Sequence, residues 1–184
     1  MVYREALMEE AAKWEKLLFA DSIRELEKQY ENKEKRDVII KTFTELFRQW
    51  SRQSVQKAAS LGICYLHSSI LMRTGELRLT LYGKEFYLDK DQIEVVWCPP
   101  GFFQMYEKDM DYLMGKLRNV YPRLYRYEEE AVRYQYVEYY YAAIEALCRD
   151  IMEEIKDSEE YRMLKKTEDF FFFFGRWRGE AAKL

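Results

Sequence analysis

Residues 76–88 read ELRLTLYGKEFYL, and they decide the fold class more than any other stretch of the chain. Leu77, Leu79 and Leu81 alternate with polar or aromatic residues. Side chains along a strand point to opposite faces in turn, so this alternation predicts a strand with one buried face and one face toward solvent. A helix would instead repeat its apolar residues every three to four positions. The chain is therefore expected to contain β-structure.

Gly83-Lys84 follows this strand directly and predicts a tight hairpin. A two-residue turn of type II′ places glycine first, because that position requires a positive φ. Pairing across the turn sets Leu81 opposite Phe86 and Leu79 opposite Leu88. The apolar residues of both strands then lie on one face, so the turn and the register agree.

Residues 61–98 hold two further expected strands. Ile63–Met72 precedes the hairpin, and apolar residues alternate again over 93–97, before Pro99-Pro100-Gly101. Short consecutive strands joined by turns usually pair with their neighbours, so we expect an antiparallel meander of three or four strands. One face of such a sheet requires a cover of helices.

Residues 1–60 predict two or three helices, because their apolar residues recur at helical spacing. Ser22, with Glu25 three residues later, has the pattern of a capping box, which predicts that a helix restarts there. The run 31–36 has no apolar residue and is expected to be a loop. Asp37 is then the expected N-cap of the next helix.

Residues 99–169 predict helices again. An apolar stripe over 103–117 stops before a proline, and a longer stripe over 126–156 predicts one long helix. Residues 170–184 form an aromatic C-terminal tail that begins with five consecutive phenylalanines. We expect a single α+β domain over 1–184, with N-terminal helices, a small antiparallel meander, and C-terminal helices packed on the sheet.

Composition excludes several classes of protein. The chain has 184 residues, with 30 basic and 33 acidic side chains and a formal net charge of -3. No segment is strongly basic, so nucleic acid is not expected as a partner, because phosphate neutralisation supplies most of that affinity. No apolar run approaches the roughly 20 residues of a membrane span. The first residues lack a secretory signal, so we expect a cytoplasmic protein with reduced cysteines and no membrane partner.

Motifs for catalysis are absent from the sequence. His67 is the only histidine, which excludes a two-histidine metal site, and Cys64, Cys98 and Cys148 lack the spacing of a zinc site. In a strand, Cys64 and His67 would point to opposite faces, which argues against a thiol–imidazole dyad. We therefore expect no catalytic residue, no metal and no cofactor. A hydrolase built on two carboxylates stays open, because paired acids leave no sequence signature.

The tyrosines are the most unusual feature of the chain. Of the 16 tyrosines, eight lie between Tyr121 and Tyr141. Tyr127, Tyr134 and Tyr141 recur every seven residues, on a different helical face from the main apolar stripe. A helix buried on two sides explains this pattern, and so does a binding surface, since tyrosine and arginine are frequent in binding hot spots. The candidate binding residues of this helix are Tyr127, Tyr134, Tyr141, Arg126 and Arg133.

The aromatic tail gives a second set of candidate binding residues, namely Phe171, Phe174 and Trp177. Five consecutive phenylalanines cannot all face solvent without causing association, nor can they share one face of a strand. We expect the tail to dock within the molecule and to leave a residual face for a second copy or a partner.

These features predict a non-catalytic cytoplasmic module that acts through an aromatic-rich surface in protein interaction or regulation, with a protein partner or self-association. The alternative is a small-molecule enzyme or ligand-binding protein with a tyrosine-lined pocket. A third class is a nucleic-acid-associated regulator, whose bases would stack on the tyrosines.

Overall fold

The structure is a computed structural model that describes residues 2–184. Two helices begin the described chain, and three strands with short helices between them occupy its middle. Three more helices follow, and the last two strands end the chain. In chain order the elements are α1 (Val2–Tyr30), α2 (Lys33–Gln53), β1 (Ala58–Tyr65), α3 (His67–Leu71), β2 (Leu77–Tyr82), the 3₁₀ helix η1 (Phe86–Leu88), β3 (Ile93–Trp97), α4 (Phe102–Val120), α5 (Arg126–Asp157), α6 (Glu159–Met163), β4 (Lys166–Arg176) and β5 (Ala181–Lys183).

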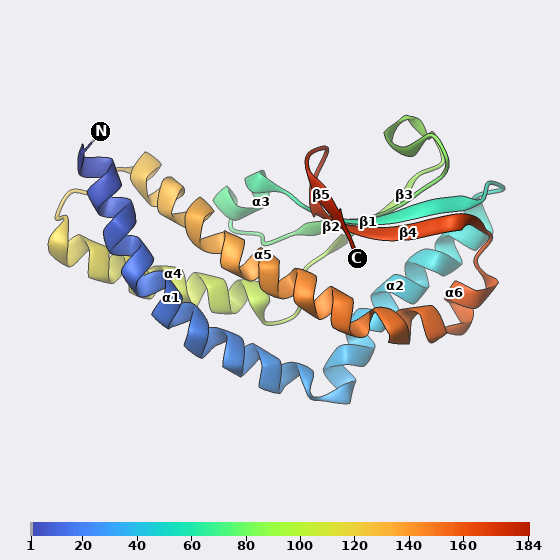
Figure 1. Ribbon diagram of the computed structural model, residues 1–184, viewed down its shortest axis with the longest axis horizontal. Coiled ribbons are helices and arrows are strands. Elements are labelled where there is room, and N and C mark those ends of the chain that lie inside the picture. Colours follow the sequence, from blue (N-terminus) through green and yellow to red (C-terminus); the bar gives the residue numbers. More distant parts are fainter. Residues whose placement is uncertain (1) are drawn as a thin grey trace.

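Three long helices form one end of the molecule and the sheet forms the other. Figure 1 shows α1, α4 and α5 side by side, with α5 continuing beneath the sheet toward α2 and α6. The expected stripe of α4 is confirmed, since Met110, Leu113 and Leu117 are fully buried. None of the described helices has both the length and the apolar composition to cross a bilayer.

The sheet has five strands in the order β3-β2-β1-β4-β5. Its β1 and β4 pair in parallel, with Leu61 beside Phe172, while the other neighbours are antiparallel. The expectation of a pure antiparallel meander is therefore wrong. A parallel pair needs a long crossover connection, and here everything from α3 to α6 separates β1 from β4, so no local pattern reveals the pairing. The C-terminal helices also pack chiefly with other helices.

The prediction of a tight hairpin at Gly83-Lys84 is also wrong. Strand β2 pairs with β3 instead, with Leu81 opposite Ile93 and Leu79 opposite Val95. That register matches apolar residues over the whole of β3, whereas the polar residues 89–92 could not have continued a strand on the buried face. The connection forms a wider loop that contains η1.

Strand β1 occupies a different range from the one expected. It starts at Ala58 and ends at Tyr65, and the remainder of the expected strand Ile63–Met72 forms α3. Gly62 lies inside β1, where a Cβ would stand 2.4 Å from Cζ of Phe173. Glycine is therefore required there because the Phe173 ring crosses the strand at that point.

Two expected helix starts are wrong as well. Helix α1 continues through Ser22 without a break, and the Ser22 hydroxyl donates to Asp109 in another helix instead of capping its own. Helix α2 begins at Lys33, with Asn32 as its N-cap in place of Asp37. The Asn32 side chain accepts a hydrogen bond of 2.9 Å from the backbone N–H of Glu34, as an N-cap should.

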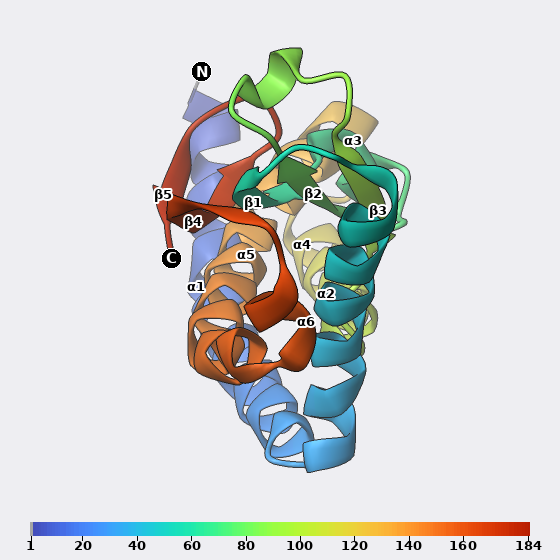
Figure 2. The same ribbon diagram turned by 90° about the vertical axis from the view of Figure 1, so that its right-hand side faces the viewer.

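The phenylalanines of β4 are divided between the two faces of the sheet. Phe172 and Phe174 join the core on the helical side, while Phe173 packs with Tyr82 and Cys64 on the other side. Figure 2 shows the helices below the sheet and the loop that contains η1 above it. The expectation that the tail docks within the molecule is confirmed, because residues 172–174 are buried on both sides by the chain itself.

Candidate functional site

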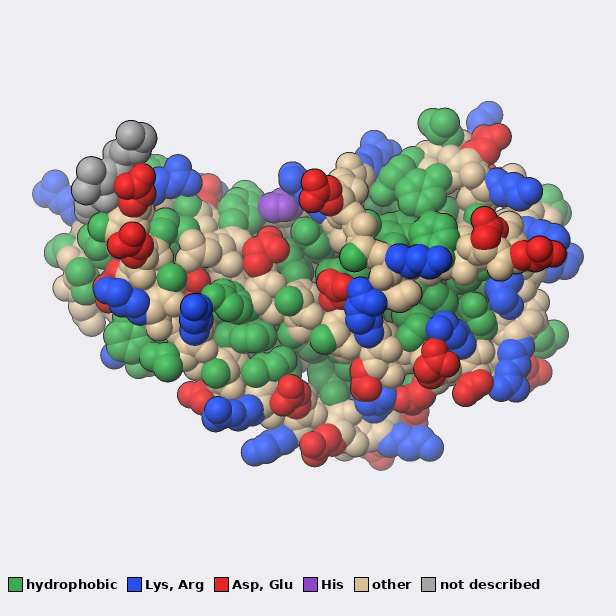
Figure 3. Space-filling view, viewed as in Figure 1, with side chains coloured by type: hydrophobic (Ala, Val, Ile, Leu, Met, Phe, Trp, Pro, Cys, Tyr) green, Lys and Arg blue, Asp and Glu red, His purple; other side chains and the backbone are tan. Residues whose placement is uncertain are grey.

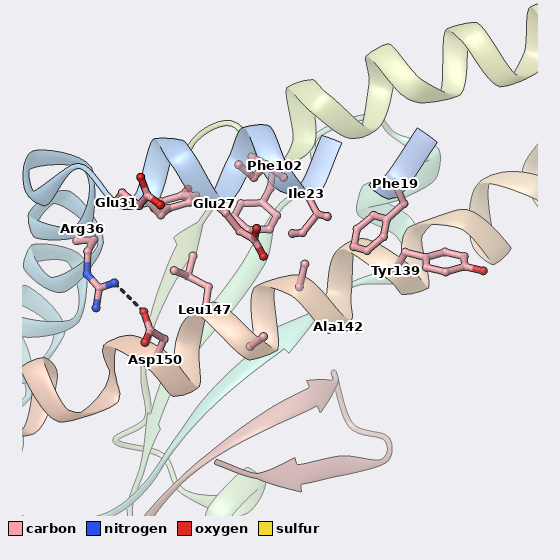
Figure 4. A pocket seen from close by; sticks show the side chains of 14 residues that line it. Phe19, Ile23, Glu27, Glu31, Arg36, Phe102, Tyr139, Ala142, Leu147 and Asp150 are labelled. Carbon is pink, nitrogen blue, oxygen red and sulfur yellow. Dashed lines mark hydrogen bonds and ion pairs between the residues drawn. The ribbon is translucent and has the colours of Figure 1, made fainter. Parts of the chain in front are cut away.

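A groove of about 640 Å³ runs between α1 and α5 (Figure 4). This volume lies within the range of about 300–1,000 Å³ that is typical of ligand-binding pockets. Its lining is predominantly apolar and comes from three helices that are distant in sequence. The apolar lining residues are Phe19, Ile23, Leu26, Tyr30, Phe102, Tyr139, Ala142, Ala143, Ala146 and Leu147.

Alanines of α5 create the space in this groove. Ala142 and Ala146 are one helical turn apart and share a face, and Ala143 lies beside them. Their side chains end at Cβ, so α5 leaves room where larger residues would close the gap against α1. Figure 3 shows hydrophobic side chains gathered along the line between α1 and α5, with charged side chains around them.

Aromatic rings form the walls of the groove and are held firmly. Phe19 of α1 packs against Tyr139 of α5 at a centroid distance of 5.3 Å. Tyr30 packs against Phe102 at 5.5 Å and donates its hydroxyl to the carbonyl oxygen of Pro100. Burial raises the pKa of Tyr30 above its ordinary value, so the phenol is neutral.

The rim of the groove carries an excess of acidic side chains. At one end, Arg36 donates to Asp150 at 2.6 Å and also to Glu154. Hydrogen bonds to Glu154 and Asp150 raise the pKa of this guanidinium, so it is committed to those carboxylates. Glu27, in the last turn of α1, and Glu31, directly after that helix, have no cationic partner within residues 2–184.

A buried carboxylate fixes the helices that make the groove. Asp109 of α4 accepts hydrogen bonds from Ser22 at 2.8 Å, from Tyr136 at 2.5 Å and from Tyr140 at 2.7 Å. These partners come from α1 and α5, so a single side chain joins three helices. Burial, together with the Asp109 carboxylate, raises the pKa of both tyrosines. Phe19 of the groove wall packs on Tyr140, so this polar network supports the groove directly.

The candidate residues near the start of α5 lie at some distance from this groove in sequence. Tyr127 is exposed, and Arg126 pairs with Glu130 at 2.9 Å. Arg133 is buried and donates two hydrogen bonds, of 2.6 and 3.0 Å, to the carboxylate of Glu107. Burial disfavours the charged form of Arg133, but the hydrogen bonds that it donates to Glu107 outweigh this effect and raise the pKa of the guanidinium above its ordinary value.

Three of the other candidate residues, Tyr134, Tyr141 and Phe174, pack against the lining of a second hollow, and a fourth, Trp177, is part of that lining. This hollow lies at the carboxyl ends of β1 and β4 and has a volume of about 600 Å³. We call it the strand-end crevice; Tyr65, His67, Glu138, Arg176, Trp177 and Arg178 are among the residues that line it. The ring of Tyr141 stacks on that of Tyr65 at 4.0 Å, and Phe174 packs at 5.9 Å from the same ring. The ring of Tyr134 lies 5.1 Å from that of His67.

Of the eight candidate residues, the structure thus brings together Tyr134, Tyr141, Phe174 and Trp177. Phe171 lies on the opposite face of the sheet, next to Phe173, with the ammonium of Lys183 at 5.4 Å from its ring. The lining of the α1–α5 groove contains none of the candidates.

The described residues offer little to nucleophilic or metal chemistry. Burial raises the pKa of the Cys64 thiol to about 12, so it is protonated at neutral pH. Burial and the nearby Arg176 lower the pKa of His67. Within residues 2–184, no three His, Cys, Asp or Glu side chains are grouped in a way that could hold a metal ion.

Comparison of the chain with protein-family models, with curated proteins and with solved structures finds no match. The groove and the strand-end crevice are the features of the described chain that bear on its function.

Proposed function

We propose that the protein is a non-catalytic interaction module that holds an amphipathic helix of a protein partner in the groove between α1 and α5. The observation that carries this proposal is an apolar channel, floored by alanines, between two long helices. Amphipathic helices are commonly bound in apolar grooves of this kind, with large side chains at positions i, i+3, i+4 and i+7 as anchors.

The dimensions of the groove suit a helix of about three turns. Its α1 wall extends from Phe19 to Tyr30, which at about 1.5 Å per residue corresponds to about 17 Å. The alanine floor permits close approach of a helix backbone, and the rings of Phe19 and Tyr139 supply a rigid apolar wall. Aromatic walls lose little conformational entropy when a partner binds, so their burial contributes fully to affinity.

The acidic side chains on the rim of the groove favour basic residues beside the apolar stripe of the partner helix. Glu27 and Glu31 are unpaired, whereas the one cation of the lining, Arg36, is already engaged by two carboxylates. Lysine or arginine beside the apolar stripe of the partner would complement these glutamates, which favours correct orientation and fast association.

The test uses two synthetic 18-residue peptides that share one leucine stripe at helical spacing. One peptide has lysines on the flanks of the stripe and the other has glutamates. Fluorescence anisotropy should show saturable binding of the lysine-flanked peptide and at least tenfold weaker binding of the glutamate-flanked peptide. Equal binding of both peptides, or of neither, would contradict the proposal.

A matched pair of variants locates the binding. Ala146→Phe fills the floor of the groove and should abolish binding, whereas Glu153→Phe adds the same ring to an exposed position of α5 outside the groove and should not. Circular dichroism verifies that both variants remain folded. If dodecanoate binds in the groove and neither peptide does, the site belongs to a small apolar ligand instead.

A further inference from the structure

The strand-end crevice is separate from the groove and has a topology suited to ligand binding. The parallel strands β1 and β4 both end at this edge of the sheet, and their continuations diverge, β1 into α3 and β4 into the turn before β5 (Figure 1). Where parallel strands end and their connections separate, a crevice opens that binds ligands in many proteins with mixed or parallel sheets.

Opposite charges line this crevice without neutralising each other. Arg176 and Glu138 both contribute side chains to the lining, and neither forms an ion pair with any other described residue. Both charges lie near the rings of Tyr65 and His67, because Arg176 lowers the pKa of each ring and Glu138 raises it. The two charges therefore lie close to the same aromatic pair and remain apart from each other.

The remaining charges of the crevice are also balanced. The guanidinium carbon of Arg178 lies 5.7 Å from the ring centroid of Trp177 and 6.0 Å from that of Tyr87. Glu180 is a second carboxylate in the lining. Two arginines oppose a simple cation, and two carboxylates oppose a phosphate or another polyanion. A ligand that carries one charge of each sign satisfies both.

We propose that the strand-end crevice binds a small zwitterion of the α-amino acid class, with its carboxylate on Arg176 and its ammonium on Glu138. An arginine fork matches a carboxylate in geometry, and both contacts are charge-assisted hydrogen bonds. Tyr65 and Trp177 supply apolar walls for an aromatic or aliphatic side chain. His67, whose pKa is lowered by burial, is neutral at pH 7 and adds no competing charge.

The test titrates the ¹⁵N-labelled protein with each of the twenty standard L-amino acids at millimolar concentration. At least one should shift the backbone amide signals of residues 65–67 and 176–180 in a saturable manner. The 2-oxo acid and the decarboxylated amine of that amino acid each lack one charge, and each should bind at least tenfold more weakly. An oxo acid or an amine that binds as well as the amino acid would overturn the proposal, as would the absence of shifts with all twenty.

Two variants and one control assign the contacts. Arg176→Gln and Glu138→Gln should each raise the dissociation constant at least tenfold, which corresponds to about 1.4 kcal/mol. Both side chains are exposed, so the fold should persist. Arg162→Gln removes an arginine charge from an exposed position of α6 outside the crevice, so the dissociation constant should change by less than threefold. An equal loss in all three variants would show a general charge effect and refute the proposed contacts.

Discussion

Asp109 gives the sharpest test of how the groove is built. Its carboxylate accepts hydroxyl hydrogen bonds from Ser22, Tyr136 and Tyr140, all in the interior of the molecule. Asp109→Ala leaves three buried donors without an acceptor, and each unsatisfied group costs about 1–3 kcal/mol. The substitution also removes a buried charge, whose desolvation is unfavourable, and this offsets part of the cost. We expect the free energy of unfolding to fall by about 3–4 kcal/mol.

Urea denaturation followed by circular dichroism measures this change. Asp111→Ala, which removes an exposed carboxylate two residues further along α4, is the control and should change stability by less than about 0.5 kcal/mol. In a double-mutant cycle, Tyr136→Phe should cost far less in the Asp109→Ala background than in the wild type. If Asp109→Ala costs less than about 1 kcal/mol, or if the two substitutions are additive, the carboxylate does not hold the helices together.

Three further predictions concern the sheet and the histidine. Gly62→Val should destabilise the fold by about 1–3 kcal/mol in urea, because the new Cβ collides with the ring of Phe173; an unchanged midpoint would contradict the packing at this site. A chain that ends at Asp169 should fail to fold by circular dichroism, because it lacks most of β4 and all of β5; a cooperative melt like that of the full chain would disprove the central place of β4. The pKa of His67 is lower in the folded than in the unfolded chain, so the unfolded state binds the proton more readily and stability should fall as pH drops through about 6.5; His67→Asn should flatten this part of the stability profile, and an identical profile would refute it.

The sequence predicted the helices and strands that depend on local pattern. The stripes of α4 and α5 and the alternation of β2 and β3 repeat at fixed periods, so short stretches reveal them. The partners of the strands were harder to predict. A turn of favourable composition at Gly83 suggested the wrong hairpin, since the pairing of Leu81 with Ile93 is decided by the match of whole strands. The parallel partner of β1 lies about a hundred residues away.

The same difference between local sequence pattern and tertiary contact applies to the two candidate sites. Tyr134, Tyr141, Phe174 and Trp177 stood out because aromatic residues are conspicuous. Trp177 lines the strand-end crevice, and the other three pack against residues that line it. The groove went unpredicted because small residues such as Ala142 and Ala146 resemble an ordinary helix surface. Only the approach of α1 turns the space above them into a channel. The available sequence signal for the groove was the three alanines Ala142, Ala143 and Ala146, close together in a long helix that mostly carries large side chains.

The most direct test of the proposed function records methyl signals of alanine. In a ¹³C-methyl-alanine sample, the lysine-flanked peptide should shift the methyls of Ala142, Ala143 and Ala146 and show intermolecular nuclear Overhauser effects to them, while the exposed Ala181 of β5 stays unchanged. Unchanged methyls at the groove floor in the presence of saturating peptide, or shifts confined to Ala181 and Ala182 of β5, would place the interaction elsewhere and contradict the proposed function.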